Sequence, residues 1–179
     1  MKRWISVAIS LLAISAASRL VSAERAGPHA TGLTEAAPDF QYRANDGRWR
    51  FLRDLCSQGH VLLVFEPGDE RLAALEREAG SLHAQGVIPI AVFRGSDSDN
   101  WSRIERLGLS YSLLSDPRGD LAAQFQIAAA PARRSTAWFL VDRDGRVHGH
   151  DRGSLPESGF ADAVTLALQP HQQASAIRP

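Results

Sequence analysis

Cysteine and lysine are almost absent from this chain of 179 residues, which has one cysteine, Cys56, and one lysine, Lys2. A lone cysteine cannot close an intramolecular disulfide, and it excludes a pair of cysteines that would exchange disulfides with a partner. An excess of charge of one sign is lacking as well, because the 20 basic residues balance the 20 acidic ones. The sequence contains no basic stripe, so we expect no nucleic-acid partner.

An apolar run long enough for a comfortable membrane span is also missing. The apolar run at residues 4–17 is shorter, follows the positive pair Lys2-Arg3, and precedes the small residues Val21-Ser22-Ala23. This pattern is typical of a secretory signal peptide at residues 1–23. We therefore expect cleavage before Glu24, no stable membrane span afterwards, and export to the periplasm or the medium of a bacterial cell. An uncleaved anchor is the alternative.

Composition divides the rest of the chain into a leader, one domain and a tail. Residues 24–35 are rich in small and polar residues and predict a flexible leader. Residues 169–179 have little apolar surface to bury and predict a disordered tail. Residues 36–168 between them contain no internal repeat and are enough for one domain with a full hydrophobic core.

Apolar patterning within this domain predicts alternating strands and helices. Continuous apolar runs at His60–Phe65 and Val87–Phe93 are typical of strands buried on both faces. Apolar residues at helical spacing predict a helix over 69–84 between them. The other expected elements are a hairpin of strands at 39–42 and 49–51, a helix from about Ser96 to Leu107, strands at 137–141 and 146–150 around a tight turn, and a closing helix at 156–168.

This order places a parallel pair of strands, joined by a crossover helix, beside an antiparallel hairpin. We therefore predict an α/β protein with a mixed central sheet that is flanked by helices and preceded by an N-terminal β-hairpin. That is the thioredoxin-like arrangement.

Four short motifs follow one another through this domain. They are Ala37-Pro38-Asp39-Phe40, residues 61–67, residues 113–119 and residues 138–145. In this order and spacing they resemble the peroxiredoxin family (alkyl hydroperoxide reductase C and thiol-specific antioxidant, or redoxin) of the thioredoxin superfamily. The resemblance implies an oxidoreductase in which a cysteine thiolate attacks the peroxide, because the thiolate is the nucleophilic form of the thiol.

The reactive residues of that family are missing at the positions where the resemblance implies them. The family has threonine four residues and cysteine seven residues after the proline of its active-site loop. Counted from Pro67, these positions hold Arg71 and Ala74. The family also has an arginine that lowers the pKa of the thiol, and its position corresponds to Thr136 in this chain. Arg134, two residues earlier, could replace that arginine. The resemblance thus implies a degenerate active site, and whether the chain is an enzyme stays open.

Four other groups of side chains are candidates for a site. Cys56 is the only thiol, with a half-buried apolar role as the simpler interpretation. His148 and His150 share a strand face and can bind a metal, with solvation at a strand end as the alternative. Arg133 and Arg134 can bind an anion or lie in a solvated loop. The last group consists of four carboxylates, which could act as a general acid and base. The alternative is that acidic side chains are simply favoured at the start of a helix. The four are Glu66, Asp69, Glu70 and Glu76.

Two functions remain after these observations. The first is an exported redoxin without peroxidase activity that acts as a binding or accessory module. Its partner would be another protein or a small anionic ligand, with a homodimer as a further option and no cofactor. The second is a weak thiol-dependent antioxidant, an oxidoreductase that uses Cys56.

Overall fold

The computed structural model describes residues 35–43, 48–127, 136–157 and 159–169. The predicted signal peptide lies outside the described residues, as do most of the predicted leader and tail, the hairpin turn, and the pair Arg133-Arg134. In the part of the chain that is described, no helix combines the length and the apolar character needed to cross a membrane.

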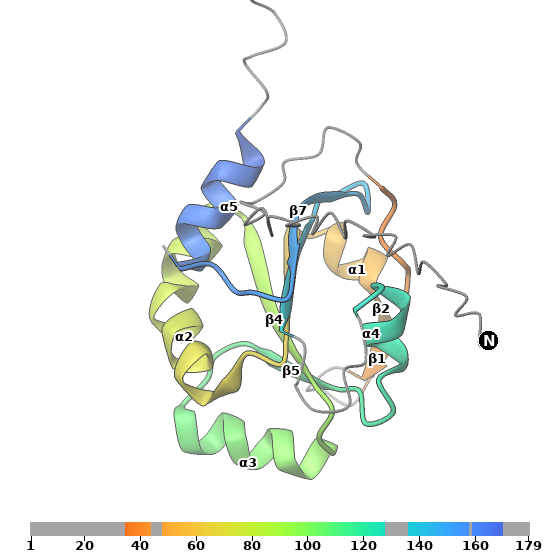
Figure 1. Cartoon of the computed structure of the whole chain (residues 1–179), viewed down its shortest axis with the longest axis vertical. Helices are drawn as coiled ribbons and strands as arrows, with labels where there is room; N and C mark the ends of the chain where they lie inside the picture. Colours follow the sequence, from red (N-terminus) through yellow and green to blue (C-terminus); the bar gives the residue numbers. More distant parts are fainter. Residues whose placement is uncertain (1–34, 44–47, 128–135, 158, 170–179) are drawn as a thin grey trace, which may run out of the picture.

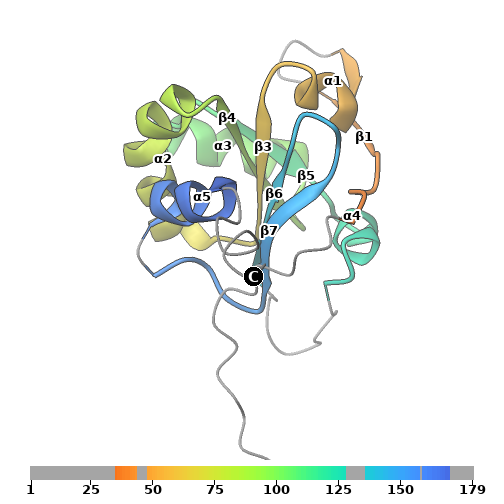
Figure 2. The same ribbon diagram turned by 90° about the horizontal axis from the view of Figure 1, so that it is seen from above.

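A five-stranded mixed sheet, in the order β5-β4-β3-β6-β7, forms the centre of the protein. Its middle strand β3 (His60–Phe65) pairs in parallel with β4 (Val87–Phe93) and antiparallel with β6 (Ala137–Val141). The edge strands are β5 (Ser112–Ser115), parallel to β4, and β7 (Val147–Arg152), antiparallel to β6. Every residue from Val61 to Phe65 is at most 1% exposed, which confirms the predicted central strand (Figure 2).

Helices cover both faces of this sheet (Figure 1). One face carries α2 (Gly68–Ala84), α3 (Asp97–Leu107) and α5 (Phe160–Leu168). The other carries α1 (Leu52–Cys56), α4 (Asp120–Gln124) and the antiparallel hairpin of β1 (Gln41–Arg43) and β2 (Trp49–Phe51). Because side chains alternate along a strand, Leu62 and Val64 of β3 point into the core under α2, whereas Leu63 points into the core under α1 and α4.

The helix α2 matches its prediction from the apolar spacing. Its apolar stripe, predicted at helical spacing, is buried at Leu72, Leu75, Ala79 and Leu82. The helix begins directly after Pro67 and carries acids in its first turn, where the partial positive charge of the helix end favours them. It ends before Gly86, whose φ of +71° suits glycine after a helix.

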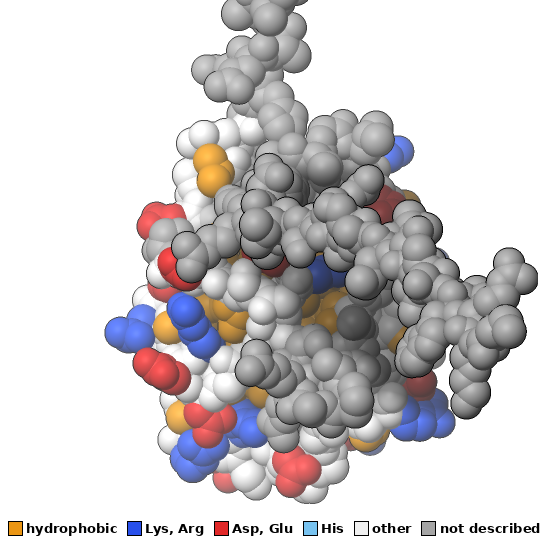
Figure 3. Space-filling model, viewed as in Figure 1, with side chains coloured by type: hydrophobic (Ala, Val, Ile, Leu, Met, Phe, Trp, Pro, Cys, Tyr) orange, Lys and Arg blue, Asp and Glu red, His pale blue; other side chains and the backbone are white. Residues whose placement is uncertain are grey.

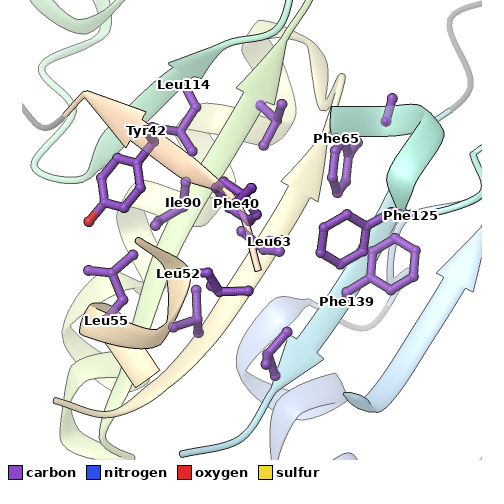
Figure 4. Close-up of a cluster of buried hydrophobic side chains, with 14 of the residues drawn as sticks. Phe40, Tyr42, Leu52, Leu55, Leu63, Phe65, Ile90, Leu114, Phe125 and Phe139 are labelled. Carbon is purple, nitrogen blue, oxygen red and sulfur yellow. The ribbon is translucent and has the colours of Figure 1, made fainter. Parts of the chain in front are cut away.

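Aromatic rings fill the core under α1 and α4 (Figure 4). Phe125, directly after α4, lies with its ring centroid 4.8 Å from that of Phe139 and 5.4 Å from that of Phe65. Phe40 from the segment before β1 completes this group at 6.3 Å from Phe125. These contacts hold the N-terminal hairpin and α4 against the sheet.

Four elements of the structure were not predicted or have other bounds than predicted. The strand β5 and the helix α4 were not expected as elements, because both are short and β5 has only two apolar residues between serines. The segment between the predicted strands at 49–51 and 60–65 forms the helix α1, whose Asp54 accepts a hydrogen bond from the Phe51 N–H. The closing helix begins at Phe160 rather than at 156, and Glu78 accepts a hydrogen bond from Ala161 N–H in its first turn.

Candidate functional site

The carboxyl ends of the parallel strands β3, β4 and β5 meet at one edge of the sheet, where ligands bind in open α/β sheets. The strand β6 starts at the same end, because Ala137 pairs with Phe65. This end therefore gathers Pro67 after β3, Arg94 after β4 and Thr136 before β6. It includes three of the positions that the family resemblance singled out: Pro67, Arg71 and Thr136.

The loop between β3 and α2 is held tightly by Glu66. Its N–H donates to the Val92 carbonyl at 2.9 Å, and its Oε1 accepts from the Arg94 N–H at 2.7 Å. Its φ of +48° is unusual for a residue with a side chain. The carboxylate thus fixes the ends of β3 and β4 to each other, and the neighbouring Pro67 is buried.

Arg71 and Ala74 occupy the positions of the family's threonine and cysteine. The Arg71 side chain is half-buried, and its Nη1 donates to the Pro156 carbonyl at 3.2 Å. Ala74 lies three residues further along α2, on the same side of the helix, and is half-buried. Glu78 continues this side and binds the start of α5. Where the family has its reactive thiol, this chain therefore has the methyl group of Ala74, on a side of α2 that packs against other residues.

Thr136 contributes its backbone to this end of the sheet. Its carbonyl accepts from the Gly153 N–H at 2.7 Å, just beyond the pairing of β6 with β7. The nearby Arg152 donates through Nε to the Phe125 carbonyl at 3.0 Å and lies over the Phe139 ring at 5.1 Å. Arg134, the predicted replacement for the family's arginine, lies outside the described residues.

Cys56 lies at the other end of the sheet. It is the last residue of α1, and this helix precedes the amino end of β3 (Figure 2). Its side chain is 2% exposed within the hydrophobic core. Burial, together with the negative charges of Asp142 and Asp39, raises the pKa of its thiol to about 11. At neutral pH about one thiol in ten thousand would be ionised, so the nucleophilic form is scarce.

The predicted acids bind separate partners instead of each other. Asp69 accepts from Arg106 Nη2 at 2.6 Å and from Arg103 Nε at 2.9 Å, and the hydrogen bond from Arg106 is the main reason that its pKa is lowered. Glu76 accepts from the N–H and the hydroxyl of Ser110. Glu66 accepts from the Arg94 N–H, so the hydrogen bonds of Glu66, Asp69 and Glu76 come from different residues.

The two histidines of β7 also have separate surroundings. A β-bulge interrupts the pairing of β6 with β7, and His148 is the extra residue, left without a partner residue on β6. His148 Nε2 lies 2.7 Å from Asp142 Oδ2, while the His150 ring stacks on Phe139 at 5.7 Å. Within the described ranges, three or more His, Cys, Asp or Glu residues nowhere come close enough together to hold a metal ion.

A cleft that sequence reasoning missed lies at the carboxyl ends of β3 and β4, beside α3. Its volume is about 480 Å³, and its charged lining comprises Glu66, Arg94, Asp99, Arg103 and Arg106. The available signal was an arginine at a strand end followed by two arginines at the i, i+3 spacing of a helix. Basic and acidic side chains also lie interspersed over the face that carries α2 and α3 in Figure 3.

The profile of the AhpC/TSA family matches residues 33–150 of the chain. No curated protein matches the sequence of this chain significantly. Among solved structures, peroxidoxin BcpB of Mycobacterium tuberculosis has a TM-score of 0.63 and 19% identity over 75% of this chain and 92% of that one. The reduced 2-Cys peroxiredoxin of Plasmodium vivax has a TM-score of 0.64 and 16% identity over 75% of this chain and 93% of its own. The bacterioferritin comigratory protein of Xanthomonas campestris has a TM-score of 0.61 and 18% identity over 72% of this chain and 88% of its own. At such identities these likenesses show the fold, and they confirm the predicted thioredoxin-like arrangement.

Proposed function

This chain belongs to the AhpC/TSA family, and we propose that it is a member without peroxidase activity that acts as a binding or accessory module. The observation that carries the proposal is the separation of the thiol from the family's reactive position. That position holds Ala74 on α2, whereas the only thiol, Cys56, lies at the opposite end of β3.

The surroundings of Cys56 support the same conclusion. Its side chain is buried and its pKa is raised, so both access and ionisation oppose attack on a peroxide. Lysine and arginine side chains next to a thiol lower its pKa, but the charges that act on Cys56 come from Asp142 and Asp39. The alternative function, a weak thiol-dependent antioxidant, depends on this residue alone.

Consumption of hydrogen peroxide in the presence of a thiol reductant separates the two functions. The wild type and the Cys56→Ser variant are compared at equal concentration, with an active peroxiredoxin as the positive control. We expect neither protein to exceed the rate of the reductant alone. Turnover by the wild type that is lost in Cys56→Ser would establish the antioxidant function, and turnover by both would contradict the binding module as well.

The proposal includes export of the protein to the periplasm or the medium. It rests on the positive, apolar and small-residue pattern of residues 1–23. Expression in a bacterium with a C-terminal tag, followed by fractionation and N-terminal sequencing, tests it. Recovery outside the cytoplasm with Glu24 as the first residue is the expected result, and an intact N-terminus in the cytoplasm would refute export.

A further inference from the structure

The cleft beside α3 has the size and the donors of a small-molecule site. Its volume of about 480 Å³ lies within the range of about 300–1,000 Å³ that is usual for ligand pockets. It opens at the carboxyl ends of β3 and β4, away from Ala74 and Cys56. Three arginines from two elements line it: Arg94 follows β4, and Arg103 and Arg106 lie one turn apart on α3.

Two of these arginines are already held in place. Arg103 donates through Nε to Asp69 Oδ1, and its guanidinium lies over the Phe93 ring at 4.3 Å from the centroid. Arg106 donates through Nη2 to Asp69 Oδ2. Each of these bonds uses one of the five N–H donors of a guanidinium, so most donors of both side chains stay available. Side chains that are fixed before binding lose less entropy on binding.

Arg94 is the most available cation of the cleft. Its side chain is exposed and packs beside Gly119, and no residue in the described ranges accepts a hydrogen bond from its guanidinium. Only its backbone N–H is engaged, with Glu66. A guanidinium presents paired donors that match the oxygens of a carboxylate or phosphate.

The two acids that line the cleft accept hydrogen bonds from nearby backbone N–H groups. Glu66 accepts from the Arg94 backbone at 2.7 Å. Asp99, in the first turn of α3, accepts from the N–H and the hydroxyl of Ser96, the N-cap residue of that helix. Each of these two carboxylates thus has at least one oxygen bound to a backbone N–H group. The unused hydrogen-bond donors of the cleft belong to the three guanidinium groups.

We propose that this cleft binds a small organic or inorganic ligand through a carboxylate or phosphate group held by Arg94, Arg103 and Arg106. The site gives the proposed binding module its ligand class, and in this sense it rests on the proposed function. The candidate ligands share an oxyanion group with two or more oxygens. Its oxygens would accept the hydrogen bonds of the Arg94 guanidinium, for which the described residues provide no acceptor.

Titration with inorganic phosphate and, separately, with succinate tests the site. Binding is measured by calorimetry and by amide chemical shifts at about 0.1 M sodium chloride, where exposed charges are already well screened. We expect saturable binding of at least one probe, with the largest shifts at Gly95, Ser96 and Ser102. Phosphate alone, succinate alone or both would each support the site and would identify the preferred group.

Matched variants separate a built site from general attraction. Arg94→Gln removes the available cation, and we expect it to weaken binding at least about tenfold, the loss typical of one charged hydrogen bond. Arg118→Gln removes an equal charge from an exposed residue that is paired with Asp120 outside the cleft, and we expect a change of less than about twofold. Equal weakening in both variants, or no saturable binding of either probe, would overturn the site.

The site and the proposed function fail in different experiments. Absence of anion binding together with absence of peroxide turnover would overturn the site and leave the non-peroxidase proposal standing. Peroxide turnover together with saturable binding that requires Arg94 would overturn the proposed function and support the site.

Discussion

At the scale of single residues, the chemistry of the chain depends on where its one sulfur lies. Cys56 is 2% exposed and has a pKa raised to about 11 by burial and by two nearby carboxylates. We expect its reaction with a disulfide reagent at pH 8 to be at least about a hundredfold slower in the native protein than in urea, where the pKa returns to about 8.5. Similar rates in both conditions would show that the thiol is accessible and ionised in the folded state.

Restoring the family's residue types at Ala74 and Arg71 tests what has happened to the reactive position. Ala74 lies in the second turn of α2, beyond the first turn where the helix end favours an anion, and Glu78 follows one turn later on the same side. In a Cys56→Ser background, we expect Ala74→Cys with Arg71→Thr to give a thiol pKa at or above about 8.5.

The pH dependence of alkylation measures this pKa, with Glu78→Gln added as the matched variant. Removal of the carboxylate should lower the pKa, because a nearby negative charge disfavours the thiolate. A thiol pKa clearly below about 7.5 before that change would mean that the loop and helix still activate a sulfur as in a reactive member of the family.

At the scale of elements, the contact between β7 and α5 leaves no room for a further atom. A Cβ on Gly149 would lie 2.7 Å from Ala167 Cβ and 3.1 Å from the Trp138 ring. We expect Gly149→Ala to lower the free energy of unfolding by about 1–3 kcal/mol through overpacking, measured by urea denaturation. Gly80→Ala is the control, because a Cβ there meets nothing within 4 Å on α2, and it should stabilise by about 0.5–1 kcal/mol. Equal effects of the two substitutions would contradict the packing.

The turn between β6 and β7 depends on the ionised form of Asp142. Burial alone would raise its pKa, but the Arg146 N–H, the His148 ring and the Asp144 N–H outweigh burial and lower it. A lowered pKa means that Asp142 stabilises the fold above its unfolded value of about 3.9 and loses this contribution as the pH falls through its folded value.

We therefore expect Asp142→Asn to cost about 1–2 kcal/mol at pH 7 and to cost less as the pH falls below about 4. Urea denaturation at pH 3, 5 and 7 measures this convergence of the two proteins. A stability difference that stays constant from pH 7 to pH 3 would show that the charge of Asp142 does not contribute.

At the scale of the whole molecule, the sequence predicts the central sheet because β3 and β4 are continuous apolar runs, which are typical of strands covered on both faces. It does not reveal β5, whose two leucines between serines are too few to show a period. The absent thiol at Ala74 could be predicted by counting from Pro67. The arginine cleft could not, because Asp69 and Arg103 lie 34 residues apart and meet only after α2 and α3 pack together.

The central claim is that this peroxiredoxin-like scaffold has no thiol that reacts with peroxide. The most direct measurement treats the reduced protein with hydrogen peroxide and dimedone, which traps a sulfenic acid, and reads the intact mass. We expect Cys56 to stay unmodified under conditions that fully convert the thiol of an active peroxiredoxin. Stoichiometric labelling of the native protein, absent in Cys56→Ser, would contradict it.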